Sequence, residues 1–231
     1  MGLGTMSVNG AGRRIILSFS VLAFSALALR AGDIEVREYS VRVDGQQAGT
    51  SQLTIVHTDD GVLCMRARTK MRVDIAGTNI FRKVYQSRES WQDGRLQQFE
   101  SHGKLDGRPF AICAQRRGER LRIQADQRSA GECQALGSEP CWRLPPGLAR
   151  ECTLPLIDSQ TGHALATHFE YVGTDRVTVG RRTNPCLHFV VVSEDPADAW
   201  YDQEGYLVRF EQSSGGHHVA LELVRVHQGQ P

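Results

Sequence analysis

Residues 63–75 read LCMRARTKMRVDI, and their alternation decides the fold class. Apolar or small side chains stand at every second position from Leu63 to Ile75, and mostly basic side chains fill the positions between them. Successive side chains of a strand point to opposite faces, so this run predicts a strand with one apolar and one basic face. A helix would instead spread the arginines around its axis. The basic row Arg66, Arg68, Lys70 and Arg72 is more typical of a solvated sheet face than of an anion site.

Strand-like runs continue on both sides of this stretch, and Asp-Gly pairs mark several of the turns between them. Long antiparallel strands that follow one another in sequence form a meander. We therefore predict an all-β protein with a single strongly curved antiparallel sheet, a half-barrel or open barrel. The expected strands are 37–43, 50–58, 63–75, 80–92, 95–104, 109–115, 120–126, 168–173, 176–179, 186–193, 199–201, 206–212 and 217–226.

The middle of the chain breaks this rhythm. Glycine, proline and cysteine collect between Ser129 and Leu154, which indicates a crossing loop, irregular or with a short helical turn. No segment is rich enough in linker residues to separate two domains. We expect one antiparallel β domain over residues 33–226 with a loop insertion around 129–154, followed by a frayed tail at 227–231.

One short phrase occurs twice. The copies are WQDGRLQQFE, residues 91–100, and WYDQEGYLVRFE, residues 200–211. Asp93-Gly94 favours a two-residue type I′ turn, which would place Trp91 opposite Leu96. A four-residue loop over 202–205 would place Trp200 opposite Leu207. On that interpretation both tryptophans lie on the same face of their hairpins.

The N-terminus has the pattern of an export signal. Arg13-Arg14 precede an apolar segment over 15–29, and Ala26-Leu27-Ala28 fits a cleavage site, with a second option at Ala31. We predict a signal peptide over 1–28 and a periplasmic or secreted protein without a transmembrane segment in its mature part. An uncleaved anchor and a twin-arginine route stay open.

Charge and cysteine content limit the function classes. Residues 33–128 hold 17 basic and 13 acidic side chains, and residues 129–231 hold 7 and 13. A nucleic-acid surface would need a larger basic excess with interleaved aromatics, so we expect no nucleic-acid partner. Six cysteines in an oxidising compartment indicate disulfide bonds. Cys64 and Cys113 form one possible pair, and one bridge is plausible among Cys133, Cys141 and Cys152. No spacing fits a zinc site, and we predict no metal and no cofactor.

These features together resemble an uncharacterised family of exported bacterial proteins, a domain of unknown function. The motifs that carry the resemblance are DGxxxG (44–49), Y…ExWxDGRL (Tyr85 and 89–96), LIDxQTG (156–162) and WYDxxG (200–205), with Trp142 before the mid-chain loop. The resemblance implies a strongly curved antiparallel sheet, similar to the half-barrels of periplasmic lipoprotein carriers. It implies no catalytic residues.

The sequence favours binding over catalysis. No G-x-S-x-G elbow and no phosphate loop is present, and Asp158 to Gly162 is typical of a β-turn. We predict no catalytic residue and lean against an enzyme. The leading hypothesis is an apolar or amphipathic ligand, such as a lipid, bound under the curved sheet. The alternative is an interaction module with an envelope protein as its partner, and a hydrolase with Asp158, His163 or His188 comes third. The predicted groove residues are Met65, Met71, Phe81, Tyr85, Trp91, Trp200 and Tyr201.

Overall fold

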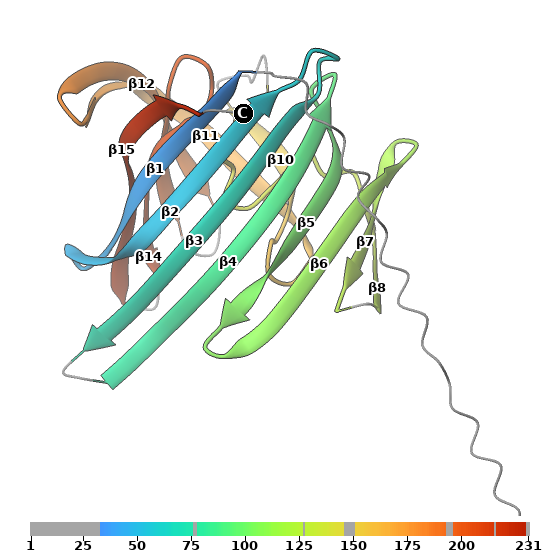
Figure 1. The fold of residues 1–231 in the computed structure, drawn as a ribbon, viewed down its shortest axis with the longest axis horizontal. Helices are drawn as coiled ribbons and strands as arrows, with labels where there is room; N and C mark the ends of the chain where they lie inside the picture. The colour runs from blue at the N-terminus through green and yellow to red at the C-terminus, as the bar shows by residue number, and fades with distance from the viewer. Residues whose placement is uncertain are drawn as a thin grey trace, which may run out of the picture.

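The computed structural model describes residues 33–75, 78–126, 128–145, 151–192, 196–214 and 216–229, and side chains within these ranges except at 74, 75, 78–81, 128–130 and 214. Every regular element in these ranges is a strand (Figure 1). The first half contains β1 (Ile34–Val43), β2 (Gln46–His57), β3 (Leu63–Ile75), β4 (Thr78–Gln92), β5 (Arg95–Leu105), β6 (Arg108–Arg117), β7 (Arg120–Ala125) and β8 (Arg128–Cys133). The second half contains β9 (Gly137–Ser138), β10 (Glu151–Ile157), β11 (Ala164–Val179), β12 (Arg182–Val192), β13 (Ala197–Tyr201), β14 (Leu207–Ser214) and β15 (His217–Gln228).

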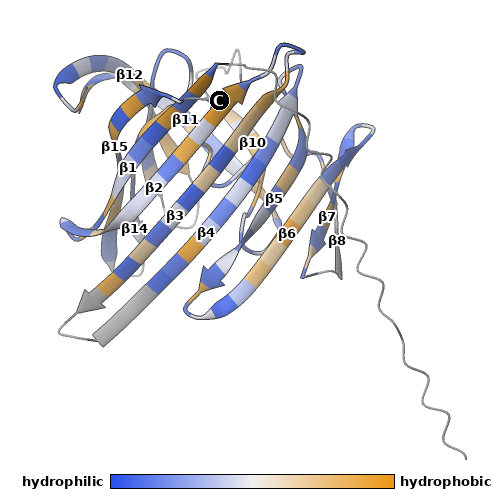
Figure 2. Cartoon of the chain, viewed as in Figure 1, coloured by the Kyte–Doolittle hydropathy of each residue, from blue (hydrophilic) through white to orange (hydrophobic). Residues whose placement is uncertain are grey.

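All fifteen strands belong to one sheet. Their order is β8-β7-β6-β5-β4-β3-β2-β1-β15-β14-β13-β12-β11-β10-β9, so two meanders meet where β1 pairs with β15. Every pair is antiparallel except β9 with β10, which is parallel. The predicted all-β antiparallel sheet is therefore confirmed, with one parallel exception at its edge. Figure 2 shows the alternation of apolar and polar residues along β3 that predicted this fold.

The two edges of the sheet do not pair with each other in the described residues, so the sheet is not closed into a barrel. Side-chain packing bridges the two halves instead. The Ser101 hydroxyl of β5 donates to the carbonyl of Ser159 at 2.5 Å. A Cβ placed on Gly162 would lie 3.2 Å from Ile123 of β7, which shows how closely the turn before β11 packs on the first half.

Two glycines permit the strong coiling of the first half. A Cβ on Gly49 would lie 2.1 Å from the carbonyl oxygen of Lys70, and a Cβ on Gly103 would lie 2.1 Å from that of Val84. Any side chain at either position would overlap the backbone of the neighbouring strand in the sheet. Glycine kinks of this kind introduce curvature into a sheet. Gly49 is the last residue of the DGxxxG motif, and this close approach is its physical explanation.

The mid-chain segment differs from its prediction. No helical turn occurs in the described part of 129–154, which contains β8, β9 and the start of β10; residues 146–150 lie outside the described ranges. The extended part around Trp142 enters the core, where its ring centre lies 5.6 Å from that of Tyr39. The Trp142 carbonyl accepts from the amide of Leu207, and the hydroxyl of Tyr201 donates to the carbonyl of Cys141. Extended backbone was favoured because these bonds to β13 and β14 satisfy its polar groups.

The first copy of the repeated phrase forms the predicted hairpin. Asp93 and Gly94 have φ of 52° and 70°, as a type I′ turn requires, and Trp91 pairs with Leu96. Trp91 is buried, and its indole N–H donates to the Glu89 carboxylate at 2.8 Å.

The second copy has a different register, and its predicted pairing is wrong. The loop closes between Asp202 and Tyr206, so it has three residues rather than four and ends on Gly205 at φ 83°. Tyr201 consequently pairs with Leu207, and a bulge sets Trp200 opposite Arg209. A shift of one residue moves a side chain to the other face of the sheet. Tyr201 therefore enters the core, whereas Trp200 lies on the outer face.

The ends of the domain differ slightly from the prediction. The proposed signal peptide lies outside the described residues. The sheet begins at Ile34, and β15 continues to Gln228, two residues into the predicted frayed tail, with the amide of Gly229 donating to the Ile34 carbonyl. The predicted strands 168–173 and 176–179 are one strand, β11, interrupted by a bulge near Gly173. The described residues contain no helix long and apolar enough to cross a bilayer.

Candidate functional site

Five of the seven predicted groove residues belong to one hydrophobic core: Met65, Tyr85, Trp91, Trp200 and Tyr201. Met65, Tyr85, Trp91 and Tyr201 are buried in the core, and Met71 packs on the core at its margin. Phe81 belongs to β4, but its side chain lies outside the described part of the structure. Trp200 is as buried as Trp91, but its position next to Tyr201 turns its side chain to the other face of β13. A groove that the described residues define lies elsewhere, on the second half of the sheet.

Trp200 organises the outer face of the second half. Its indole N–H donates to Asp175 at 2.9 Å, and its ring stacks on the imidazole of His188 with centres 4.4 Å apart. His188 lies between two carboxylates, 3.0 Å from Asp175 and 2.8 Å from Asp198. The guanidinium of Arg209 lies 5.0 Å from the Trp200 ring centre, within the range of a cation–π interaction. These contacts fasten the base of the β11–β12 hairpin to β13 and β14.

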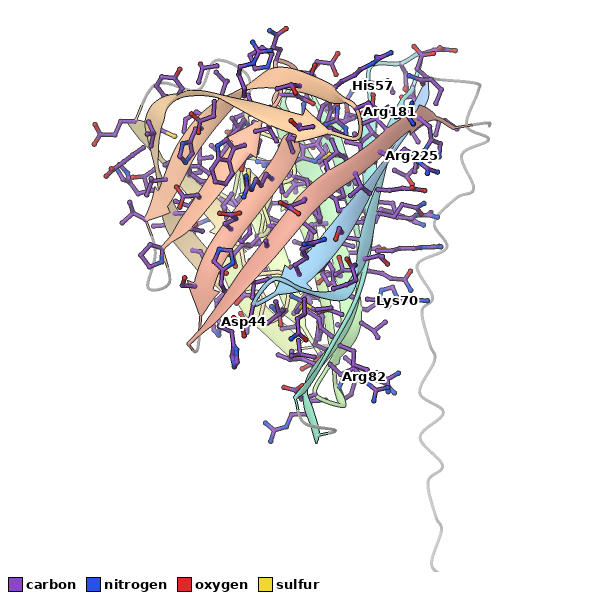
Figure 3. The ribbon with its side chains drawn as sticks, turned by 90° about the vertical axis from the view of Figure 1, so that its left-hand side faces the viewer. Asp44, His57, Lys70, Arg82, Arg181 and Arg225 are labelled. Atoms are coloured by element: carbon purple, nitrogen blue, oxygen red, sulfur yellow. The ribbon has the colours of Figure 1, made fainter. Side chains whose placement is uncertain are left out.

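The far part of that hairpin bends over the sheet. The pairing of β12 with β13 ends at Leu187, so the remainder of the hairpin extends beyond the strand beside it. Its tip lies over β15, where a Cβ on Gly180 would be 3.7 Å from the carbonyl of Val224. Figure 3 shows Arg181 at this tip, close to Arg225 of β15.

A groove of about 450 Å³ lies between the bent hairpin and the outer face of β14 and β15. This volume falls within the range of small-molecule sites, about 300–1,000 Å³. We call it the hairpin groove. Val208 and Leu223 are buried beneath it. Its lining residues are Arg176, Val177, Thr178, Gly180, Val208, Arg209, Glu222, Leu223 and Val224.

The two arginines of the hairpin groove differ in how free they are to contact a ligand. Arg209 is engaged, because its Nε lies 2.8 Å from Glu211 and 3.8 Å from Glu222. Arg176 is exposed on the hairpin side of the groove. The lining therefore combines apolar valines and a leucine with the accessible cation of Arg176, and the Glu222 carboxylate lies beside Arg209. That combination suits a small molecule with an apolar body and an anionic group.

A polar row along the inner face of β4 contains buried groups whose pKa values are shifted. Burial raises the pKa of Glu89 to about 7, although hydrogen bonds from Ser138 and Trp91 favour its carboxylate. Burial lowers the pKa of Lys83, and Asp158 and Glu139 act in the opposite direction. Burial also raises the pKa of the Tyr85 hydroxyl. Glu89 is only 3% exposed, so this row lies within the core and is not an open site.

The cysteines form no disulfide. All six lie in the described ranges, and all are free. Cys64 on β3 and Cys113 on β6 both face outward as predicted, but β4 and β5 separate them, about 14 Å at the usual strand spacing. A bridge between them is therefore excluded in this fold. Burial raises the pKa of Cys141 to about 12, which makes its thiol unreactive.

The three residues of the hydrolase hypothesis, Asp158, His163 and His188, do not form a common site. The Asp158 carboxylate accepts the amides of Gln160 and Thr161, as a turn residue does. His163 is exposed in the same turn, and His188 contacts Asp175 and Asp198 instead. The three side chains do not assemble. No cluster of three or more potential metal ligands occurs among the described residues.

Sequence reasoning missed the hairpin groove because it divided β11 into two short strands. One signal was present in the sequence. The strand-like residues 176–179 and 182–192 are separated by a two-residue turn, and the second of these strands is far longer than the five-residue β13 beside it. Such an overhang has to pack on some other surface. Glu89 was missed as a buried acid, although strand parity places it in the inward row with Tyr85 and Trp91.

The fold defines an open, barrel-like all-β protein. The chain belongs to the family of the domain of unknown function DUF6134, whose model matches residues 39–224. This confirms the resemblance to an uncharacterised domain family. No curated protein matches the chain.

Two solved structures are similar in fold. A β-barrel-like protein of the domain of unknown function DUF1849 from Brucella abortus has a TM-score of 0.60 at 11% identity, over 88% of this chain and 100% of that chain. A protein with a YmcC-like fold from Bacteroides fragilis has a TM-score of 0.32 at 8% identity, over 84% of this chain and 95% of that chain. The first supports the barrel-like architecture alone, and the second is too distant for any inference. Similarity to lipoprotein carriers stays a prediction.

Proposed function

We propose that this protein is exported and binds a small amphipathic molecule with an anionic group in the hairpin groove. The observation that carries the proposal is a space of about 450 Å³ with Val177, Val208 and Leu223 in its lining and the exposed cation of Arg176 beside them. Export rests on the sequence pattern over residues 13–31. This proposal places the ligand on the outer face rather than under the curved sheet.

Decanoate is a suitable probe, because it has one carboxylate on a flexible apolar chain. Isothermal titration should detect its binding to the protein, and Arg176→Gln should weaken that binding about tenfold, because a charge-assisted hydrogen bond contributes about 1.5–3 kcal/mol. Thr178→Trp should weaken it further by filling the groove. Arg181→Gln is the matched control, since Arg181 is a neighbouring arginine outside the lining.

The proposal fails if decanoate does not bind the wild-type protein, or if the Arg181 variant loses as much affinity as the Arg176 variant. A crystal structure with decanoate on another surface would also contradict it. The second candidate, an interaction module of the cell envelope, is favoured by a different surface, the outer face of β3 and β4.

A further inference from the structure

A row of cations runs along the outer face of β3 and continues onto β4. Arg66, Arg68, Lys70 and Arg72 are exposed at every second position of β3. Such positions are about 6.8 Å apart in an antiparallel strand, so the row is about 20 Å long. Arg82 and Arg88 extend it onto β4, and Figure 3 shows Lys70 and Arg82 pointing away from the body of the sheet. We call these six residues the basic track.

The register brings like charges together within the basic track. Arg66 lies opposite Arg88, and Arg72 lies opposite Arg82. Like charges directly opposite each other destabilise a sheet. Partial burial, together with Arg88 and Arg68, lowers the pKa of Arg66, as expected for cations that repel each other. An anionic partner would add attractive interactions along this row of cations.

Neutral polar groups and one carboxylate border the track. Thr50, Gln52 and Thr54 of β2 lie opposite Lys70, Arg68 and Arg66. On the other side, Gln86 of β4 lies opposite Arg68, and Glu100 of β5 lies opposite Arg88. The cationic surface is consequently narrow and linear. Its borders carry hydroxyl and amide groups, and the Glu100 carboxylate beside Arg88, all of which can hydrogen-bond to a partner with many hydroxyls.

The residues around the basic track argue against a nucleic acid, a bilayer and an acidic peptide as its partner. The outward positions of the described parts of β3 and β4 hold no aromatic side chain, whereas single-stranded nucleic acids bind through stacking on aromatics. They also hold no large apolar anchor of the kind that inserts into a bilayer. Both strands lie inside the sheet with neighbours on each side, so an acidic peptide could not gain main-chain hydrogen bonds by joining an edge.

We propose that the basic track binds an extended acidic polysaccharide, with carboxylates of the carbohydrate on the arginines and lysine and its hydroxyls on the bordering threonines and glutamines. The track lies on the first half of the sheet and is independent of the hairpin groove. Its function would be attachment of this protein to an anionic carbohydrate surface.

Polygalacturonate tests this proposal, because it is a linear carbohydrate with a carboxylate on each sugar, and dextran is its neutral counterpart. Biolayer interferometry with the immobilised protein should show polygalacturonate binding that weakens as salt rises, and no dextran binding. The double variant Arg68→Gln/Lys70→Gln should lose about tenfold in affinity, at about 0.7 kcal/mol per lost charge contact. Circular dichroism checks that the variant remains folded.

The matched control is Arg117→Gln/Arg122→Gln, which removes the same charge from exposed positions of β6 and β7. It should change the affinity less than twofold. Equal losses in both variants would show that net charge alone drives binding and would overturn the proposal. Failure of the wild-type protein to bind polygalacturonate, or tight binding to phosphatidylglycerol vesicles in its place, would overturn it as well.

Discussion

The guanidinium of Arg37 lies 2.6 Å from the carboxylate of Asp202, although 165 residues separate them in the chain. Arg37 is only 3% exposed, and its guanidinium also lies 4.6 Å from the ring centre of Tyr206. Burial lowers the pKa of Arg37, but Asp202, Tyr39 and Glu35 together outweigh burial and raise it overall. The other Asp202 oxygen accepts the amides of Glu204 and Tyr206. Asp202 therefore shapes its own turn and joins that turn to β1.

This double role predicts unequal effects at the two aspartates of the repeated phrase. Asp202→Asn should lower the free energy of unfolding by about 2 kcal/mol, because it removes a charge-assisted hydrogen bond from the buried Arg37 and leaves Glu35 as the nearest carboxylate. Asp93→Asn should change it by less than about 0.5 kcal/mol, since asparagine also tolerates the positive φ of a type I′ turn. Urea denaturation measures both. Similar losses in the two variants would show that Asp202 acts only as a turn residue.

Glu89 should make stability depend on pH near neutrality. Its pKa in the folded protein is about 7, above the usual value of an unfolded glutamate, so the folded state binds the proton more tightly. The stabilisation is complete below the unfolded pKa and is lost as pH rises through 7. Unfolding free energies should therefore fall by on the order of 3 kcal/mol between pH 5 and pH 8 from this group. Glu89→Gln should abolish that fall, and an unchanged pH slope in the variant would refute the assignment.

Gly49 and Gly103 should be irreplaceable, whereas Gly173 should not be. Alanine at Gly49 or Gly103 would place its Cβ 2.1 Å from a backbone oxygen, while nothing lies within 4 Å of a Cβ on Gly173. We expect Gly49→Ala and Gly103→Ala to lose more than about 3 kcal/mol or to fail to fold, because backbone atoms cannot move aside cheaply. Gly173→Ala should remain within about 1 kcal/mol of wild type. Soluble yield and thermal unfolding distinguish these outcomes, and a stable Gly49→Ala protein would contradict the proposed origin of the curvature.

Trp200 should control the hairpin locally. Trp200→Phe removes the hydrogen bond to Asp175 and part of the stacking on His188, so amide hydrogen exchange should accelerate across the β11–β12 hairpin. Trp91→Phe removes a hydrogen bond to the buried Glu89 and should destabilise the whole core instead. Exchange mass spectrometry resolves the two patterns. Acceleration across all strands in the Trp200 variant would contradict its local role.

Local sequence patterns were sufficient to predict most strands in the first half of the sheet. The 63–75 alternation and the Asp93-Gly94 turn depend only on side-chain parity and backbone φ, and both predictions were confirmed. The predicted pairing in the second copy of the phrase was wrong because its sequence is compatible with a loop of three residues as well as with one of four. That single-residue difference moved Trp200 out of the predicted groove. The strands β8, β9 and β10 were missed because their hydrogen-bond partners, rather than their own composition, make them strands.

The sequence by itself determined the all-β class, the basic row of β3 and the family resemblance, because each depends on periodicity or on a contiguous motif. The tertiary structure decided which side chains share a face across distant strands. It alone placed Arg37 against Asp202, buried Glu89 and bent the β11–β12 hairpin over β14 and β15. The physical reason is that register shifts at bulges and short loops, together with the packing of an overhanging hairpin, depend on contacts between residues far apart in the chain.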